Sequence, residues 1–257
     1  MLKQTFIALI APLAVSAAGS HSLSVVTLNL AKEVSVPRMA AELRARPDLR
    51  DADVFLLQEV ADGAAEGLAG NLRLHFASSP PAPGTGDHLA ILSRYPLREV
   101  RVRQLKRYDL VFHTRSRFAL SATAETPWGP VRVLNTHLDT RINSSERLAQ
   151  LQAAMGDTAG EATIVGGDFN SNWFYWINHV LPVPAWRSQA SGVESFMTAA
   201  GYRTAVPRPA TTFDYLGQHL DWIWLRGIGP TASRIYPLKF SDHHACWARV
   251  EMRPRAK

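Results

Sequence analysis

Short apolar runs recur along this chain, and several of them end at a polar side chain. Five of these runs are SVVTLN (24–29), DVFLLQE (53–59), VRVLNTH (131–137), ATIVGGD (162–168) and HLDWIWL (219–225). Runs this short and this rich in Val, Ile and Leu predict buried strands rather than helices. Three further strands are predicted at LAILSR (89–94), RFALSATAE (117–125) and HACWARVE (244–251).

Apolar residues at helical spacing lie between these strands and predict helices over residues 37–46, 144–155 and 191–200. Capping-box pairs mark two of the starts, Asn143 with Glu146 and Ser191 with Glu194, and Gly201 follows the third helix. A hairpin is predicted around Trp128. Strands and helices mix without strict alternation, which predicts an α/β fold with sheets packed on each other and helices outside.

The first twenty residues have the pattern of a secretory signal. Lys3 supplies a positive charge, residues 6–15 are apolar, and Ser16 to Ala18 are small enough for cleavage. The run is too short to span a membrane. We therefore expect a signal peptide over residues 1–20, a single mature domain over residues 21–257, and a monomer that is secreted or periplasmic; a buried N-terminal helix is the alternative.

Charge and cysteine content change this picture only slightly. The 257 residues carry a formal net charge of +6 and include one cysteine, Cys246, which excludes an internal disulfide and a Cys-based zinc site. Cys246 lies in an apolar alternating stretch, so we expect a packed thiol. A basic protein attracts polyanions, among them nucleic acids, anionic lipids and phosphorylated metabolites.

The polar strand ends are the candidate chemistry. A lone Asn or Asp after a strand is usually a turn residue or a cap. Strands that end on a common edge, however, would gather at one rim the side chains of Asn29, Glu59, His137, Asp168, Asn170 and Asp221. Clustered carboxylates repel one another unless a cation neutralises them. Oxygen ligands without thiolate favour Mg²⁺, with Mn²⁺ or Ca²⁺ as alternatives.

Two local motifs add to this set. Gly166 and Gly167, before Asp168 and Asn170, allow a sharp turn and close approach of the backbone to a ligand. In the segment SDHH (241–244), one histidine can face the site and transfer a proton near neutral pH while its neighbour packs. A histidine that is simply hydrogen-bonded in the core is the alternative for His243.

Six short motifs resemble, in their order along the chain, those of the endonuclease/exonuclease/phosphatase superfamily, which has the deoxyribonuclease I-like fold. They are TLN, LQE, LNTHLD, GGDFN, LDWIWL and SDHH. The resemblance runs from about residue 22 to residue 249. It implies a four-layer α/β/β/α sandwich of two mixed or antiparallel sheets packed face to face, with outer helices. LAILSRYPL and the helix around Arg147 to Gln150 also resemble family features.

The resemblance also implies roles. Asn29, Glu59 and Asp242 match metal-site positions, with Glu59 as the main ligand. Asp168 matches the residue that orients or deprotonates the attacking water, Asn170 and His137 match phosphate-contacting positions, and Asp221 matches the carboxylate that pairs with the histidine, His243. The implied reaction is one in-line attack by water on phosphorus; whether Asp168 or His243 is the base is left open.

Three functions remain at this point. The basic charge favours a nuclease or general phosphodiesterase. The NTHLD segment and an aromatic segment favour a phosphatase or a phospholipase C-type enzyme acting on inositol phosphates or sphingomyelin-like lipids. A catalytically silent binding module is the third, and filled motif positions argue against it.

Two segments bear on the substrate. Residues 98–117 hold seven Lys and Arg residues against Glu99 and Asp109, and predict either a path for a polyanion or a solvated strand face. The aromatic residues from Trp173 to Trp176, with Trp186 downstream, predict either packing on their own domain or contact with bases or a membrane. The expected partner is a phosphate ester, with peripheral membrane contact through residues 173–176 as a further hypothesis.

Overall fold

The computed structural model describes residues 21–108, 114–158, 162–185 and 188–252. The predicted signal peptide over residues 1–20 lies outside the described residues, as do Asp109 and Trp186. None of the helices in the described ranges is long and apolar enough to cross a bilayer.

The described residues form two mixed six-stranded sheets. The first has the order β13-β14-β1-β2-β4-β3, with the bounds Gly229–Tyr236, Ala245–Glu251, Ser22–Asn29, Val54–Val60, His88–Ser93 and His75–Ser78. The second has the order β11-β12-β8-β7-β6-β5, with the bounds Arg203–Thr204, Asp221–Arg226, Thr163–Asp168, Gly129–His137, Phe118–Thr126 and Leu97–Gln104. In each sheet one pair is parallel, β1 with β2 and β7 with β8, and the other pairs are antiparallel.

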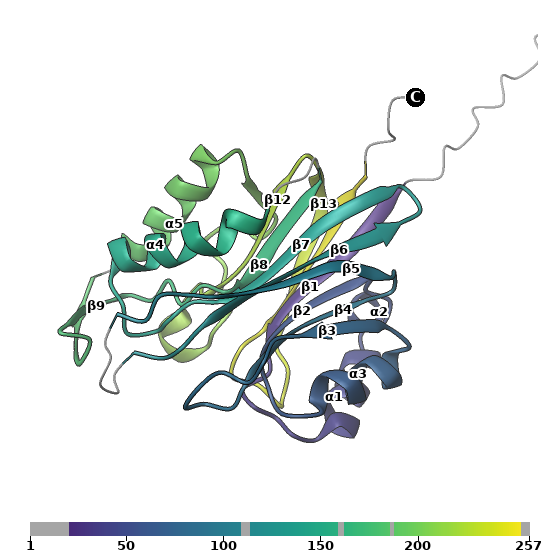
Figure 1. Ribbon diagram of the computed structural model, residues 1–257, viewed down its shortest axis with the longest axis horizontal. Coiled ribbons are helices and arrows are strands. Elements are labelled where there is room, and N and C mark those ends of the chain that lie inside the picture. The colour runs from purple at the N-terminus through teal and green to yellow at the C-terminus, as the bar shows by residue number, and fades with distance from the viewer. Residues whose placement is uncertain (1–20, 109–113, 159–161, 186–187, 253–257) are drawn as a thin grey trace, which may run out of the picture.

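Helices cover the outer face of each sheet, so the predicted four-layer α/β/β/α sandwich is confirmed (Figure 1). Helices α1 (Val36–Arg44), α2 (Pro47–Arg50) and α3 (Ala64–Leu72) lie on the first sheet. Helices α4 (Ser144–Ala154) and α5 (Ser188–Ala199) lie on the second. Two 3₁₀ turns, Met155–Asp157 and Tyr215–Gly217, and a separate ribbon of β9 (Phe174–Ile177) and β10 (Leu181–Pro184) complete the elements.

The apolar core forms three clusters, one for each interface between layers. In β1, Val26 and Leu28 face the helices whereas Val25 faces the second sheet. In β12, Ile223 faces the first sheet and Trp224 faces α4 and α5. Because these strands are buried on both faces, they read as continuous apolar runs. Cys246 is buried between the sheets, as predicted.

Several boundaries differ from the sequence prediction. The helix expected over residues 37–46 is α1, which ends at Arg44, and Pro47 begins a separate short helix, α2. The third helix starts at Ser188, so Ser191 and Glu194 are not a capping box; Glu194 instead binds Arg208. The box of Asn143 and Glu146 is confirmed at the start of α4, and the predicted hairpin joins β6 to β7.

Other elements gave too weak a pattern to be predicted: α3, β3, β5, β13 and the β9–β10 ribbon. Strand β5 is exposed along nearly its whole length. The basic segment over residues 98–117 is therefore in part a solvated strand face, as one of the two interpretations expected.

A polar bridge crosses between the two sheets below the polar edge. Gln58 Nε2 donates to Asn135 Oδ1 at 2.7 Å, and Asn135 Nδ2 donates to the carbonyl oxygens of Leu57 and Ala90 at 2.7 and 2.9 Å. Asn135, two residues before the end of β7, is fully buried and joins the two sheets. These hydrogen bonds join the two sheets, although Gln58 Oε1 is buried without a hydrogen-bond partner among the described residues.

Candidate active site

The predicted polar side chains come together at one edge of the sandwich, where strands of both sheets end. The carboxyl ends of β1 and β2 lie there because these strands are parallel, and the same holds for β7 and β8. Strand β12 is antiparallel to β8, in a register that pairs Asp221 with Asp168. The first residue of β12 therefore meets the last residue of β8.

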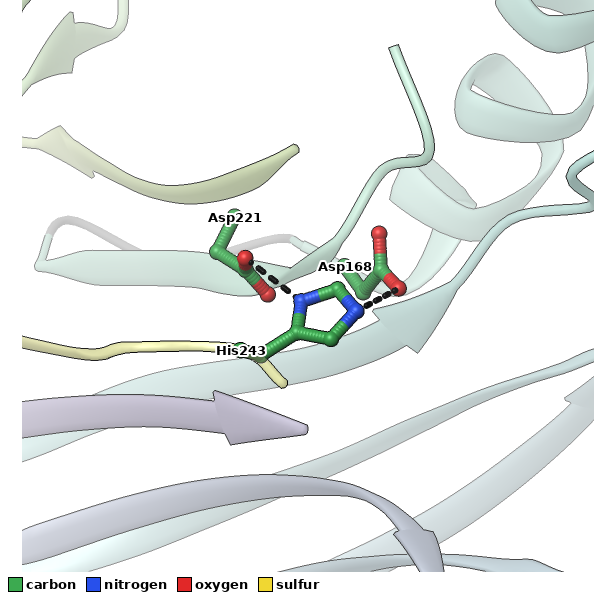
Figure 2. Close-up of side chains that lie close together, drawn as sticks. All are labelled: Asp168, Asp221 and His243. Atoms are coloured by element: carbon green, nitrogen blue, oxygen red, sulfur yellow. Dashed lines mark hydrogen bonds and ion pairs between the residues drawn. The ribbon is translucent and has the colours of Figure 1, made fainter. Parts of the chain in front are cut away.

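A histidine joins these two carboxylates. His243 Nδ1 lies 2.8 Å from Asp221 Oδ2, and its Nε2 lies 3.7 Å from Asp168 Oδ2 (Figure 2). All three side chains are buried, and one ligand atom from each lies within 4.8 Å of the others. Thr212 fixes the start of β12, because its Oγ1 accepts the N–H groups of Leu220 and Asp221.

The charges in this row shift two pKa values. Burial raises the pKa of Asp168 to about 6, although the positive charge of His243 opposes the shift. Burial alone would lower the pKa of His243, but the negative charges of Asp221 and Asp168 outweigh burial and raise it above its ordinary value. At neutral pH the row therefore holds an imidazolium between two carboxylates.

His137 approaches Asp168 from β7, with Nε2 at 3.4 Å from Asp168 Oδ2. Its other nitrogen, Nδ1, lies 3.0 Å from Arg117 Nη1. A guanidinium can only donate, so Nδ1 is the acceptor and Nε2 of the neutral ring carries the hydrogen. Burial, and next the positive charge of Arg117, hold the pKa of His137 well below its ordinary value. His137 is thus a neutral donor aimed at Asp168.

Two asparagines hold the Asp168 carboxylate. Asn29 Nδ2 donates to Oδ2 at 3.1 Å, and the backbone N–H of Asn170 donates to Oδ1 at 2.8 Å. Asn29 Oδ1 accepts the N–H of Ala31, so both ends of this side chain are engaged in hydrogen bonds. Asn170 has a positive φ of 47°, and its Nδ2 donates to the carbonyl oxygen of Leu138. An amide nitrogen has a second hydrogen, which leaves Asn170 one donor for the pocket.

Glu59 and Asp242 stand apart from this buried row. A bulge in β2 between Leu57 and Val60 gives Glu59 a positive φ of 49°, a conformation that costs energy and often marks functional sites. Neither carboxylate has a hydrogen bond or an ion pair with any of the described residues. Both line the same pocket as Asp168 and His243. They are therefore accessible oxygen ligands.

This pocket has a volume of about 410 Å³. Its polar side includes Glu59, His137, Asp168, Asn170, Asp242 and His243. Its apolar side includes Phe174, Trp176, Pro182, Phe213 and Tyr215. Phe174 and Trp176 thus lie at the pocket, whereas Trp173 lines a separate pocket. The pocket thus combines a polar side rich in carboxylates with an apolar side.

A hard cation fits the oxygen donors of this edge. Carboxylate oxygens in a site without thiolate ligands suit Mg²⁺. The only cysteine among the described residues, Cys246, is buried. Asp168, Asp221 and His243 are the closest potential ligand group, but both nitrogens of His243 already face the carboxylates. Glu59 and Asp242 are the carboxylates free to accept an ion.

The two glycines have a role in strand packing that the sequence did not predict. At Gly167, where φ is 139°, an added Cβ would lie 1.8 Å from the carbonyl oxygen of Thr136. At Gly166 an added Cβ would lie 2.7 Å from the side chain of Leu56. In the structure the glycines let β8 pack against its neighbouring strand and the first sheet, which in turn places Asp168, whereas close approach of the backbone to a ligand stays a prediction.

The contacts of two arginines at the site were not predicted from the sequence. Arg117 contacts His137, and Arg147 binds backbone carbonyl oxygens near the site. Arg147 is fully buried on α4, and its Nη1 donates to the carbonyl oxygens of Asp139 and Phe169 at 2.7 and 2.9 Å. It thus holds the segments that follow His137 and Asp168. Arg147 occupies an apolar position of an amphipathic helix, and this pattern could have indicated a buried, paired arginine.

The model of the endonuclease/exonuclease/phosphatase family matches residues 26–243. No curated protein matches the chain. The solved endonuclease/exonuclease/phosphatase from Beutenbergia cavernae DSM 12333 is 19% identical, with a TM-score of 0.68 over 90% of this chain and 72% of that chain. The human nocturnin catalytic domain with bound sulfate is 19% identical, with a TM-score of 0.66 over 90% and 94% of the two chains. TDP2 from D. rerio, complexed with a single-strand DNA product, is 16% identical, with a TM-score of 0.64 over 90% and 99%.

Proposed function

The chain belongs to the endonuclease/exonuclease/phosphatase family, and from this premise we propose that it is a Mg²⁺-dependent hydrolase of phosphate esters. The observation that carries the proposal is the row of Asp221, His243 and Asp168, joined by one hydrogen bond and one ion pair, which opens on a pocket with Glu59 and Asp242. The row supplies groups that can accept and donate a proton, and the pocket supplies carboxylates for a cation.

Asp168 is the proposed acceptor for the proton of the attacking water. Its raised pKa, about 6, keeps it ionised at neutral pH while making it a better base than an ordinary aspartate. His243 is held protonated by its two carboxylate neighbours, so it suits a donor to the phosphate rather than a base. These pKa directions support Asp168, rather than His243, as the proposed base.

The remaining donors would share the charge that develops on the phosphate oxygens. His137 carries its hydrogen on Nε2, and Asn170 has one amide hydrogen left for the pocket. Asn29 keeps Asp168 oriented, and Asp221 keeps His243 oriented. Held by Glu59 and Asp242, with Asn29 as a further ligand proposed from the resemblance, Mg²⁺ would supply Lewis-acid polarisation of a phosphoryl oxygen.

A nuclease or general phosphodiesterase is the first proposed substrate class. The net charge of +6 favours a polyanion, and the TDP2 neighbour was solved with a single-strand DNA product. A phosphatase or phospholipase C-type enzyme is the second candidate, because Phe174, Trp176 and Pro182 give the pocket an apolar side. The first twenty residues support the further proposal that the protein is exported.

A substrate panel tests the proposal. Plasmid DNA, RNA, phospholipid vesicles, inositol phosphates and simple phosphomonoesters are each incubated with Mg²⁺ or with EDTA. We expect Mg²⁺-dependent release of product from at least one of them. Nicking of DNA without lipid cleavage would select the nuclease, and the reverse result would select the lipid headgroup. Hydrolysis of none, at enzyme concentrations near those of the substrate, would contradict the proposal.

A further inference from the structure

Exposed apolar side chains concentrate on one small element beside the pocket. Among the described residues, eleven large apolar side chains are exposed, and five of them lie in the β9–β10 ribbon or its turn. In Figure 1 the segment labelled β9 lies at the left edge of the molecule, beyond the end of α4. Two more of the eleven, Tyr215 and Leu216, lie in the 3₁₀ turn that also borders the pocket.

The two faces of the ribbon differ in what they contact. Tyr175 pairs with Val183 and Ile177 pairs with Leu181 across the ribbon, so these four side chains share one face. Their exposed fractions are 53%, 38%, 44% and 58% in that order. This face, called here the outer face, consists of apolar side chains that no other layer of the described residues covers.

The other face of the ribbon lines the catalytic pocket. Phe174, Trp176 and Pro182 alternate with the outer residues and all line the pocket. Aromatic residues of this segment therefore divide in two: some complete the pocket, and Tyr175 points away from it. Among Phe174, Tyr175 and Trp176, for which membrane contact was a hypothesis, only Tyr175 lies on the outer face. Its neighbours on that face are apolar.

The ribbon is held in place rather than loosely attached. Asn143 Nδ2 donates to the carbonyl oxygen of Trp176 at 2.9 Å, and the backbone N–H of Trp176 donates to Asn143 Oδ1 at 2.6 Å. His179 in the turn lies 3.1 Å from the Glu146 carboxylate. Asn178 and His179 both have positive φ, and Val180 N–H donates to Ile177, as in a type I′ hairpin turn. The outer face is thus presented in a fixed position.

The chemistry of the ribbon disfavours a protein strand as its partner. Pro182 and Pro184 have no N–H group, and both lie on β10, an edge strand of the ribbon. An added strand would find few donors there. A second copy of the chain is disfavoured by size, because stable interfaces bury about 1,200 Å² or more and four side chains on a two-stranded ribbon offer far less.

Positive charges near the pocket fit an anionic headgroup layer. The Arg141 guanidinium lies 5.5 Å from the centre of the Trp176 ring and is exposed. Arg115 is also exposed, and its backbone N–H donates to the side chain of Asp139, which follows His137 by two residues. Aliphatic and tyrosine side chains with nearby cations are the composition of segments that lie in membrane interfaces.

We propose that the outer face of the β9–β10 ribbon, formed by Tyr175, Ile177, Leu181 and Val183, inserts into the headgroup region of an anionic phospholipid surface. The pocket, which the opposite face of the ribbon lines, would then lie beside the membrane surface rather than facing it. The binding does not depend on turnover, so it can be tested even if the proposed hydrolysis fails.

The test is co-sedimentation of the purified protein with vesicles of phosphatidylcholine and phosphatidylglycerol at four to one, about 0.1 µm across, in 0.5 M NaCl to screen charge. The variant is Ile177→Ser with Leu181→Ser. The matched control is Val100→Ser with Val102→Ser, whose parent side chains are 46% and 40% exposed on β5. We expect the bound fraction to fall about fivefold or more in the ribbon variant and to stay unchanged in the control.

Two further measurements separate the proposal from its competitors. Hydrolysis of soluble bis-p-nitrophenyl phosphate by the ribbon variant should match wild type within about twofold, because the outer face points away from the pocket. Analytical ultracentrifugation should give the same mass for both proteins. The proposal is overturned if wild type does not sediment with the vesicles, if the ribbon variant sediments equally well, or if wild type is a dimer that the variant dissociates.

Discussion

Asp168 and Asp221 lie side by side across the antiparallel ladder of β12 and β8, although fifty-three positions separate them in the sequence. His243 reaches both carboxylates from outside the sheet, with its Nδ1 on Asp221 and its Nε2 facing Asp168. Two buried acids at this spacing would repel each other. A protonated histidine between them relieves that repulsion, and the row therefore acts as one unit.

The first prediction concerns the orientation of His243. Asp221→Asn keeps the shape of the side chain but removes the negative charge that helps to hold His243 protonated. We expect kcat to fall about 10²-fold near pH 8, as is typical when an orienting carboxylate is lost. The alkaline limb of the pH–rate profile should also move to lower pH. A profile that keeps its shape and position would contradict the proposed role.

The second prediction concerns the acid limb. Because burial raises the pKa of Asp168 to about 6, the carboxylate is protonated below that pH and ionised above it. A base must be ionised to accept a proton, so we expect the rate to fall about tenfold per pH unit below 6. Steady-state rates from pH 4.5 to 9 check this. A rate that is constant down to pH 4.5 would exclude Asp168 as the base.

The third prediction concerns the tautomer of His137. Arg117→Lys keeps a positive charge near Asp87 but loses the planar donor that faces His137 Nδ1. We expect an activity loss of about tenfold with KM little changed. Arg132→Lys is the control, since Arg132 is equally buried but binds Ser121 and Thr123 at the other end of β7. Equal losses in both variants would point to a general packing defect.

The fourth prediction is a stability effect. Gly167→Ala would force a Cβ into contact with the Thr136 carbonyl oxygen at an unfavourable φ. We expect the free energy of unfolding to fall by about 3 kcal/mol or more, measured by chemical denaturation. Gly70→Ala in α3 has open space around its Cβ and should raise stability by up to about 1 kcal/mol. The interpretation of Gly167 fails if both variants unfold at the same denaturant concentration.

Much of the fold was predictable because burial on both faces leaves a clear signal. Strands such as β1, β8 and β12 appear as apolar runs, and their ends bring Asn29, Asp168 and Asp221 to one edge. Strand β5 escaped prediction because nearly all of its residues are exposed, so it lacks the buried apolar run that marks the other strands. The β9–β10 ribbon escaped because Pro182 and Pro184 are unusual in strands, although Asn178 was a turn signal.

The site was less predictable than the fold. Side chains at strand ends could be listed from the sequence, but their partners could not. Arg117 lies just before β6, without any pattern that links it to His137, and only tertiary packing places its guanidinium 3.0 Å from that ring. The direction of each pKa shift likewise depends on burial and on charges that lie far apart in the sequence.

The most direct test of the central claim is Mg²⁺-dependent hydrolysis of bis-p-nitrophenyl phosphate by wild type, Glu59→Gln, Asp168→Asn and His243→Ala, with Glu66→Gln on the exposed side of α3 as control. We predict activity in wild type and in the control that EDTA abolishes, and a loss of about 10²-fold or more in the three site variants, with unfolding midpoints near wild type. Full activity in EDTA, or in all three site variants, would contradict the account.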